Sequence, residues 1–189
     1  MSQVKSQPEG SRKVLRDPLN RHLFQDGQLT VYAVLDGAAI PGLLDNLYAD
    51  DGPEFCCLYR GELEPDLAEC APYLTALKPG AGFTDWLLTE GWGNHWGIYA
   101  SSAANMKAMQ KHFRTFLMVK DPDGKQLYFR YYDPRVLRVY LLTCNQQEVA
   151  TVFGPVRHYS LEDEMPSVLL RFWPDQTPPR KEAVQLASL

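Results

Sequence analysis

Residues 29–48 read LTVYAVLDGAAIPGLLDNLY, a pattern that predicts a buried strand followed by a helix. The run 29–35 is rich in apolar and β-branched residues, as in a strand covered on both faces, and an Asp-Gly pair ends it. Apolar side chains then recur at helical spacing from Ile40 to Tyr48, with Pro41 in the first turn, where proline is tolerated. A strand that leads directly into a helix is typical of α/β proteins.

The remainder of the chain continues this alternation. The turn pattern DPDG at 121–124 predicts an antiparallel hairpin, because proline and glycine occupy favoured positions of a type I turn. Asp133 before Pro134 predicts a helix start, and Asn145 with Glu148 has the spacing of a capping box. Further strands are expected at 55–60, 71–77, 95–100, 127–132, 156–159 and 167–172. The predicted fold class is therefore α/β, with a mixed sheet flanked by helices in a single compact domain.

Two further helices are expected in the middle of the chain. Thr84 is expected to cap a short helix that Gly91 ends. Ser101 or Ser102 is expected to cap a longer one. In this longer helix the apolar face carries Met106, Met109, Phe113 and Phe116, and the solvent face carries Lys107, Lys111 and Arg114.

With 189 residues, the chain has room for one ordinary domain. Residues 1–26 are basic and poor in large apolar groups, which predicts a mobile N-terminal arm. The α/β domain is expected over 27–174. Residues 175–189 follow a cluster of prolines and are expected to form a Pro-rich tail or a short docked helix.

Composition excludes several classes of protein. Hydrophobic residues make up 45% and charged residues 22%, as in a folded soluble domain. Apolar runs fall short of the roughly 20 residues that cross a bilayer, so membrane insertion is not expected. A secretory signal pattern is missing, which makes the cytoplasm the expected location. The net charge of −4 gives no general attraction to nucleic acid.

Motifs of catalysis and metal binding are missing from the sequence. There is no phosphate-binding glycine loop, no nucleophile elbow and no HExxH helix, and the four cysteines contain no CxxC pair. We therefore expect no enzyme activity, no cofactor and no metal. One alternative stays open: a small hydrolase or transferase that uses Cys57 or Asp36 with His95.

An acidic segment precedes the middle of the chain. Residues 45–69 contain eight carboxylates against one cation, Arg60. Such a segment forms either a solvated rim or a docking surface that attracts a basic partner and weakens as salt rises.

The heptapeptide QLYFRYY at 126–132 alternates in a way that suits a strand with one buried and one exposed face. The alternation places Tyr128, Arg130 and Tyr132 on a common face, away from Leu127, Phe129 and Tyr131. Trp, Tyr and Arg contribute most strongly to protein interfaces. Arg130, Tyr132, Asp133 and Arg135 are expected to form a hydrogen-bonded and ionic cluster that either fixes the helix that follows or meets a partner. If the chain binds another protein, the expected contact residues are Trp92, Trp96, Tyr128, Arg130, Tyr132 and Arg135.

Alternative roles apply to some of these positions. Trp92 and Trp96 also suit the core, because the neighbouring glycines permit close packing. Asp36 and Asp133 each precede a turn or a helix and are expected to be structural caps.

Six segments, taken together and in order, resemble the bacterial type VI secretion adaptor chaperones of the Tap/Tec group, catalogued as a domain of unknown function. They are VLDGA at 34–38, LYRG at 58–61, APYL at 71–74, GWG with WGI between 91 and 98, FRYYDPRVL at 129–137 and FGPV at 153–156. The resemblance implies a non-enzymatic cytoplasmic adaptor that binds a toxin effector and helps to load it onto the VgrG spike. It also implies a compact version of the family, because few residues follow position 156.

Overall fold

The computed structural model describes residues 9–120 and 123–186. Strand β1 (Thr30–Asp36) lies within the main sheet, where β3 and β4 pair with it on either side. It is buried from its second residue onward, as its unbroken apolar sequence predicted. The sheet has the order β2-β3-β1-β4-β7-β8-β9. The other strands are β2 (Phe55–Cys57), β3 (Pro72–Leu77), β4 (Gly97–Ser102), β7 (His158–Glu162), β8 (Val168–Trp173) and β9 (Arg180–Gln185).

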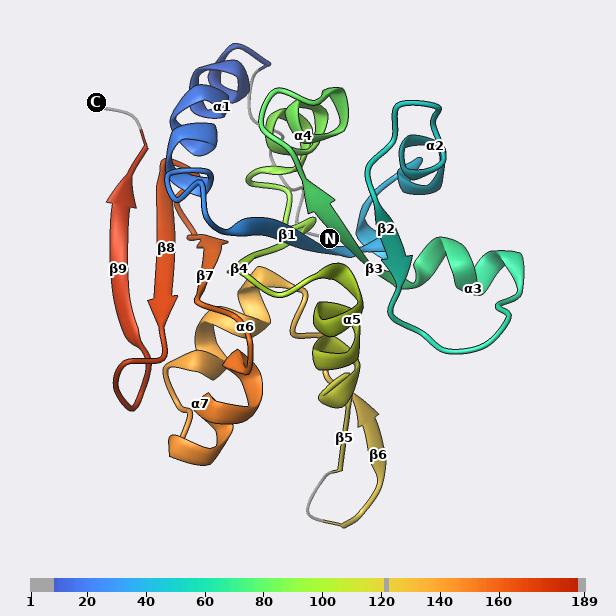
Figure 1. The fold of residues 1–189 in the computed structure, drawn as a ribbon, viewed down its shortest axis with the longest axis vertical. Coiled ribbons are helices and arrows are strands. Elements are labelled where there is room, and N and C mark those ends of the chain that lie inside the picture. The colour runs from blue at the N-terminus through green and yellow to red at the C-terminus, as the bar shows by residue number, and fades with distance from the viewer. Residues whose placement is uncertain (1–8, 121–122, 187–189) are drawn as a thin grey trace, which may run out of the picture.

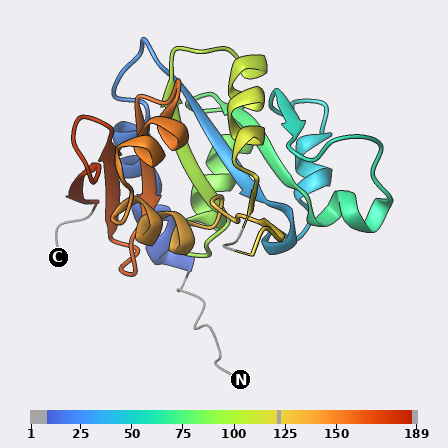
Figure 2. The same ribbon diagram turned by 90° about the horizontal axis from the view of Figure 1, so that it is seen from below.

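Helices cover both faces of this sheet, and each face has its own core (Figure 1). Tyr32 and Val34 of β1 pack with α5 (Met106–Thr115), α6 (Pro134–Leu141) and α7 (Gln146–Phe153). The alternate residues of β1 pack with α1 (Glu9–Leu23), α2 (Leu43–Leu47) and α4 (Gly82–Trp86). Figure 2, viewed from below, shows α5, α6 and α7 on the near side of the strands.

The expected α/β class, with helices flanking the sheet of one compact domain, is confirmed. The prediction of a mixed sheet was wrong, because each described pairing in the main sheet is antiparallel. Two short turns complete the layers, a 3₁₀ turn (Gly37–Ala39) and a π-helical turn (Leu87–Gly91). No helix within the described part of the chain is long and apolar enough to span a membrane.

Two structures project from the layers (Figure 1). Helix α3 (Pro65–Cys70) follows the edge strand β2 and has no buried residue. Strands β5 (Met118–Lys120) and β6 (Gln126–Tyr128) form the expected antiparallel hairpin, a separate two-stranded sheet beyond α5. The turn predicted at 121–124 lies partly outside the described residues.

The N-terminal prediction was wrong for residues 9–23, which form α1. Leu15, Leu19 and Leu23 are buried in the core at 8%, 0% and 3% exposure. They recur every four residues, which is a helical stripe. The surrounding charges and Pro18 hid this pattern in the sequence. Residues 1–8 of the predicted arm lie outside the described part.

The C-terminal prediction was also wrong, because residues 180–185 form strand β9 and pair with β8. The prolines of this region precede the strand and do not interrupt it. Arg180 lies over the ring of Trp173 at 4.0 Å from its centroid, and Lys181 and Glu182 are exposed. A charged edge strand has no strong apolar alternation, so its sequence resembles a tail.

Local details differ in the middle of the chain. Thr84 lies inside α4, where its hydroxyl accepts a hydrogen bond from the backbone of Lys78, and it is not a helix cap. Asn105 caps α5 in place of the expected serines. Asn145 and Glu148 form the expected capping box of α7.

Candidate protein-binding surface

A buried ion pair lies at the end of β1. Asp36 is 2% exposed, and its carboxylate accepts a hydrogen bond of 2.5 Å from Arg130 and one of 3.2 Å from the backbone N–H of Ala38. The hydrogen bond with Asp36 raises the pKa of Arg130. Because the Arg130 side chain is 51% exposed, one side of its guanidinium faces solvent. Asp36 is thus both a turn cap and the anchor of an exposed cation.

Three tyrosines extend this cluster to the surface. The guanidinium of Arg130 lies 6.0 Å from the ring centroid of Tyr132. The hydroxyls of Tyr132 and Tyr59 share a hydrogen bond, and burial raises the pKa of both phenols. The ring of Tyr59 packs 5.4 Å from that of Tyr128, which is 59% exposed. A continuous series of contacts therefore joins the buried carboxylate to an exposed aromatic ring.

A second acidic cap begins α6. Asp133 is 4% exposed and accepts hydrogen bonds from both the backbone and the guanidinium of Arg135. Burial is the largest single influence on the Asp133 carboxyl and acts to raise its pKa, but the bonds from Arg135 outweigh it and the pKa is lowered. The Arg135 side chain remains 55% exposed.

Of the six predicted contact residues, Tyr128, Arg130 and Arg135 lie at the surface. Tyr132 is 3% exposed, so the prediction that it contacts a partner needs correction. The reason is that β6 ends at Tyr128 and the next residues turn, with the N–H of Tyr131 bonded to the carbonyl of Phe129. The alternation of a strand does not continue past that point, and the side chains of Tyr131 and Tyr132 both lie in the core.

The two tryptophans are also mainly structural. Trp92 is 5% exposed, and its indole N–H donates to the carbonyl of Pro166 at 2.7 Å, so it is not available as a contact residue. Trp96 is half-buried and packs 5.1 Å from Trp86. A Cβ atom at position 91 would lie 2.7 Å from the Trp96 ring, which explains why this position is glycine.

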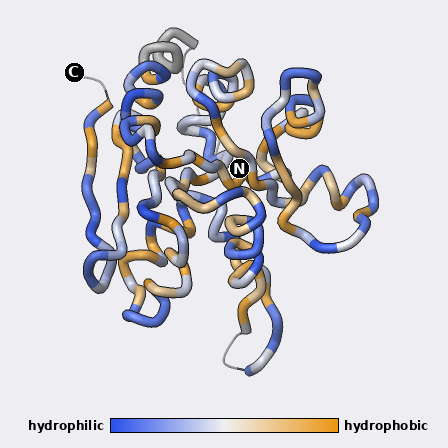
Figure 3. The backbone as a smooth tube through the Cα atoms, viewed as in Figure 1, coloured by the Kyte–Doolittle hydropathy of each residue, from blue (hydrophilic) through white to orange (hydrophobic). Residues whose placement is uncertain are grey.

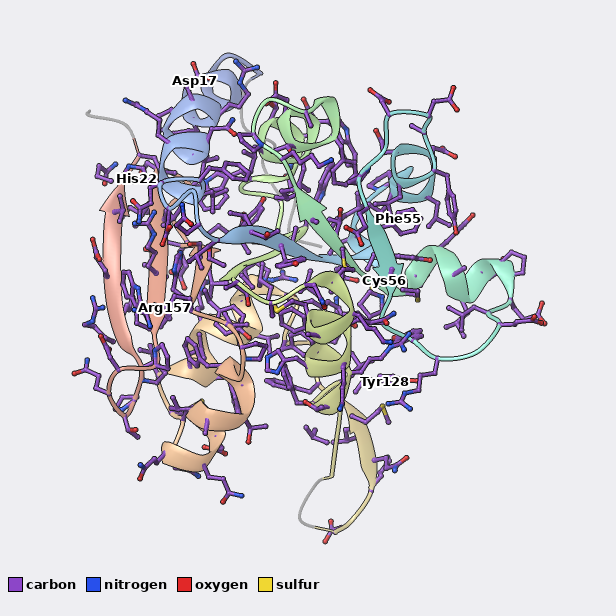
Figure 4. The ribbon with its side chains drawn as sticks, in the orientation of Figure 1. Asp17, His22, Phe55, Cys56, Tyr128 and Arg157 are labelled. Atoms are coloured by element: carbon purple, nitrogen blue, oxygen red, sulfur yellow. The ribbon has the colours of Figure 1, made fainter. Side chains whose placement is uncertain are left out.

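A groove that the sequence did not reveal lies beside Tyr128. It encloses about 310 Å³ between residues 58–67 and the β5–β6 hairpin. Figure 4 shows Tyr128 at the base of the hairpin. The groove is mainly apolar, and its lining includes Leu58, Tyr59, Leu63, Leu67, Leu117, Met118 and Tyr128, with Arg60 and Arg114.

Arg114 organises one wall of this groove. Its guanidinium donates to the carbonyl oxygens of Cys57, Leu58 and Tyr59 at 2.9 to 3.1 Å. The prediction of a freely solvated Arg114 is therefore wrong, because the chain after β2 folds back over α5. Helical periodicity identifies the face of a residue but not the segment that later covers it.

The hairpin is apolar on both faces. Met118 lies opposite Tyr128, and Val119 lies opposite Leu127. All four side chains are between 38% and 59% exposed. Figure 3 shows hydrophobic residues continuing from the core into this hairpin. These four side chains form an exposed apolar surface on a two-stranded ribbon, a structure that is only marginally stable alone.

The acidic segment supplies part of the groove lining but none of its carboxylates lines the groove. All eight carboxylates between Asp45 and Glu69 are exposed, and none of them forms an ion pair with another described residue. Within this segment the groove residues Leu63 and Leu67 are sequence neighbours of three acids, Glu62, Glu64 and Asp66.

The side chains of the enzyme alternative are bonded to other groups, although the backbone N–H of Asp36 donates to the carbonyl of Trp96, next to His95, at 2.9 Å. The ring of His95 is bonded to the buried carboxylate of Glu162, and Asp36 is bonded to Arg130. Cys57 is three strands away from Gly97, so at a strand spacing of about 4.8 Å the separation is roughly 14 Å.

Burial raises the pKa of the Cys57 thiol, which favours its neutral form. Among the described residues, no group of three or more His, Cys, Asp or Glu side chains is placed to hold a metal ion.

Comparison with known proteins gives one match. A family model described as "Domain of unknown function (DUF4123)" matches residues 31–151, from β1 into α7. The matched region contains the Asp36–Arg130 pair, the groove and the hairpin. No curated protein and no solved structure matches the chain significantly.

Proposed function

Because this chain belongs to the DUF4123 family, we propose that it is a type VI secretion adaptor chaperone. In this role it binds a toxin effector in the cytoplasm and promotes its loading onto the VgrG spike. The six segments that resemble the Tap/Tec adaptors support this assignment, and five of them lie wholly within the matched region.

The observation that carries the proposal is the exposed apolar surface formed by the groove and the hairpin. Tyr128 belongs to both the groove and the hairpin, and it packs on Tyr59, which is hydrogen-bonded to Tyr132. The guanidinium of Arg130 lies 6.0 Å from the ring centroid of Tyr132. Interfaces concentrate their binding energy in aromatic and arginine side chains that sit among apolar contacts. This surface therefore has the composition of a protein-binding site.

A second exposed apolar surface suits the second partner of an adaptor. On and just beyond α6, Val136, Val139 and Leu142 are 36%, 61% and 46% exposed. Arg135 precedes them on the same helix. An adaptor that holds an effector and a spike protein together needs two such surfaces, one for each partner.

A role without catalysis, cofactor, nucleic acid or membrane insertion is part of the proposal. Two observations support it. Cys57 lies three strands from Gly97 of β4, away from the segment that contains His95, and the net charge of −4 does not favour nucleic acid. Binding and release of another polypeptide require no reacting group.

The test is affinity purification from bacteria that carry the chain's own secretion genes. The wild-type chain is expected to recover an effector together with VgrG. The Tyr128→Ala variant is expected to lose at least tenfold of the recovered effector. Tyr48→Ala is the matched control, because Tyr48 is also an exposed tyrosine, at 73%, but does not line the groove. Recovery of no secretion component with the wild-type chain would contradict the proposal.

A further inference from the structure

We infer that the groove between residues 58–67 and the β5–β6 hairpin binds a basic, apolar segment of the effector. This inference rests on the proposed function and adds to it the chemistry of the bound segment. Its two components, apolar contact and charge, come from different residues of the same surface.

The apolar component comes from both walls of the groove. Leu63 and Leu67 line one wall, and Met118 and Tyr128 line the other. Leu67, Met118 and Tyr128 are 47%, 39% and 59% exposed. A space of about 310 Å³ between them accepts large apolar side chains, whose burial removes this surface from water.

The charged component comes from the acids that surround Leu63 and Leu67. Glu62, Glu64 and Asp66 are exposed and form no ion pair with any other described residue. Their field attracts lysine and arginine and repels acidic segments, which directs the choice of partner more than it adds affinity.

The cations of the groove do not cancel this field. Arg60 is one charge against three adjacent carboxylates. Arg114 keeps its positive charge, because its hydrogen bonds to the neutral carbonyls of residues 57–59 hold the guanidinium in place without neutralising it. The two arginines of the lining therefore stand against three flanking carboxylates, which leaves a small negative excess. The local balance therefore favours a partner segment with positive charge.

The hairpin wall gains stability when the groove is filled. Its strands pair over three residues each, and the N–H of Phe129 bonded to the carbonyl of Leu117 holds its base. A segment that covers Met118 and Tyr128 gives this ribbon the packing partner that a two-stranded sheet needs for stability.

Photo-crosslinking in cells identifies the bound segment directly. A photoreactive phenylalanine analogue is placed at position 67 or 128, inside the groove, or at position 139, on the exposed face of α6. Crosslinks from 67 and 128 are expected to map to one effector segment with net positive charge and large apolar residues. Effector crosslinks from 139 alone, or a segment with net negative charge, would overturn the inference.

Charge reversal tests the electrostatic component separately. The triple variant Glu62→Lys, Glu64→Lys, Asp66→Lys is expected to weaken effector binding at least tenfold at low salt and to abolish its salt dependence. The triple variant Asp45→Lys, Asp50→Lys, Asp51→Lys makes the same change in charge around α2, away from the groove lining, and is expected to bind within threefold of wild type. Equal losses in the two variants would contradict a local charge effect.

The outcomes separate this inference from the proposed function. If secretion components crosslink at position 139 but not in the groove, the groove assignment fails and the adaptor function stands. If none crosslinks at any of the three positions and none is recovered with the wild-type chain, the adaptor function itself fails.

Discussion

At the residue scale, the pair formed by Asp36 and Arg130 has a buried member and an exposed one. Asp36 is 2% exposed, whereas the Arg130 side chain is 51% exposed. Loss of either partner therefore has unequal consequences, because water can solvate Arg130 but not Asp36.

We predict that Arg130→Ala lowers the free energy of unfolding by about 2–3 kcal/mol, because it leaves a buried carboxylate with only the Ala38 N–H as partner. Asp36→Asn is expected to cost about 1–2 kcal/mol, because the amide keeps an acceptor and Arg130 turns to solvent. Urea unfolding of both variants measures the difference. A larger loss for Asp36→Asn would contradict this account.

A buried histidine predicts how stability depends on pH. Burial, helped by the nearby charge of Arg171, lowers the pKa of His158 to about 4. The unfolded chain binds a proton at this position near pH 6.5, so between these values the unfolded state holds more protons and stability falls as the pH falls.

We expect His158 to remove about 2 kcal/mol of stability between pH 7 and pH 5. The pKa values of His22 and His112 are also lowered by burial, so both act in the same direction. In His158→Gln, the difference in unfolding free energy between the two pH values should shrink by that amount. An unchanged difference would show that His158 titrates normally in the folded protein.

At the element scale, the sequence predicted those strands and helices whose pattern is local. The strand predicted at 29–35 was confirmed, because a short continuous apolar run is typical of a strand buried on both faces. The capping box of Asn145 and Glu148 was confirmed, because its two partners are only three residues apart. Helix α1 and strand β9 were missed because each is stabilised by distant contacts, such as the bond from Arg171 to the carbonyl of His22.

The difference between local patterns and distant contacts also explains which parts of the candidate site could be predicted from the sequence. Caps at Asp36 and Asp133 follow from adjacent residues, and the structure has both. The groove combines residues 58–67 with a hairpin more than fifty positions later, a meeting that no local pattern encodes. Tyr132 was misplaced because the length of a three-residue strand cannot be read from alternation alone.

Helix α1 should behave as part of the core. Leu19 is 0% exposed, so Leu19→Ala is expected to lower the free energy of unfolding by about 2–5 kcal/mol through lost burial and the cavity left behind. Arg16→Ala at a half-buried position of the same helix, which removes ion pairs with Asp17 and Asp85, should cost at most about 1 kcal/mol. Thermal or urea unfolding decides the matter, and a negligible effect of Leu19→Ala would mean that the helix is only loosely attached.

At the scale of the whole molecule, the four cysteines differ in how far the fold shields their thiols from solvent. Cys70 is exposed, Cys56 and Cys57 are half-buried, and Cys144 is buried. Burial raises the pKa of the Cys56 and Cys144 thiols to about 11, which lowers their thiolate fraction at neutral pH.

Alkylation of the native protein is therefore expected to modify Cys70 at least tenfold faster than the other three cysteines. Mass spectrometry after short exposure to iodoacetamide at pH 7.5 measures the order. In urea, where the fold is lost, all four should react at similar rates. Rapid native labelling of Cys144 would indicate that the core opens readily.

The two ends of the main sheet are unsuited to recruit another backbone. On one side β2 offers only three residues, and on the other β9 carries Arg180, Lys181 and Glu182 along its length. Short or charged borders of this kind discourage both amyloid-like stacking and recognition by strand addition. Under the proposed function, an effector would then be held through its side chains and not by pairing with the borders of the main sheet.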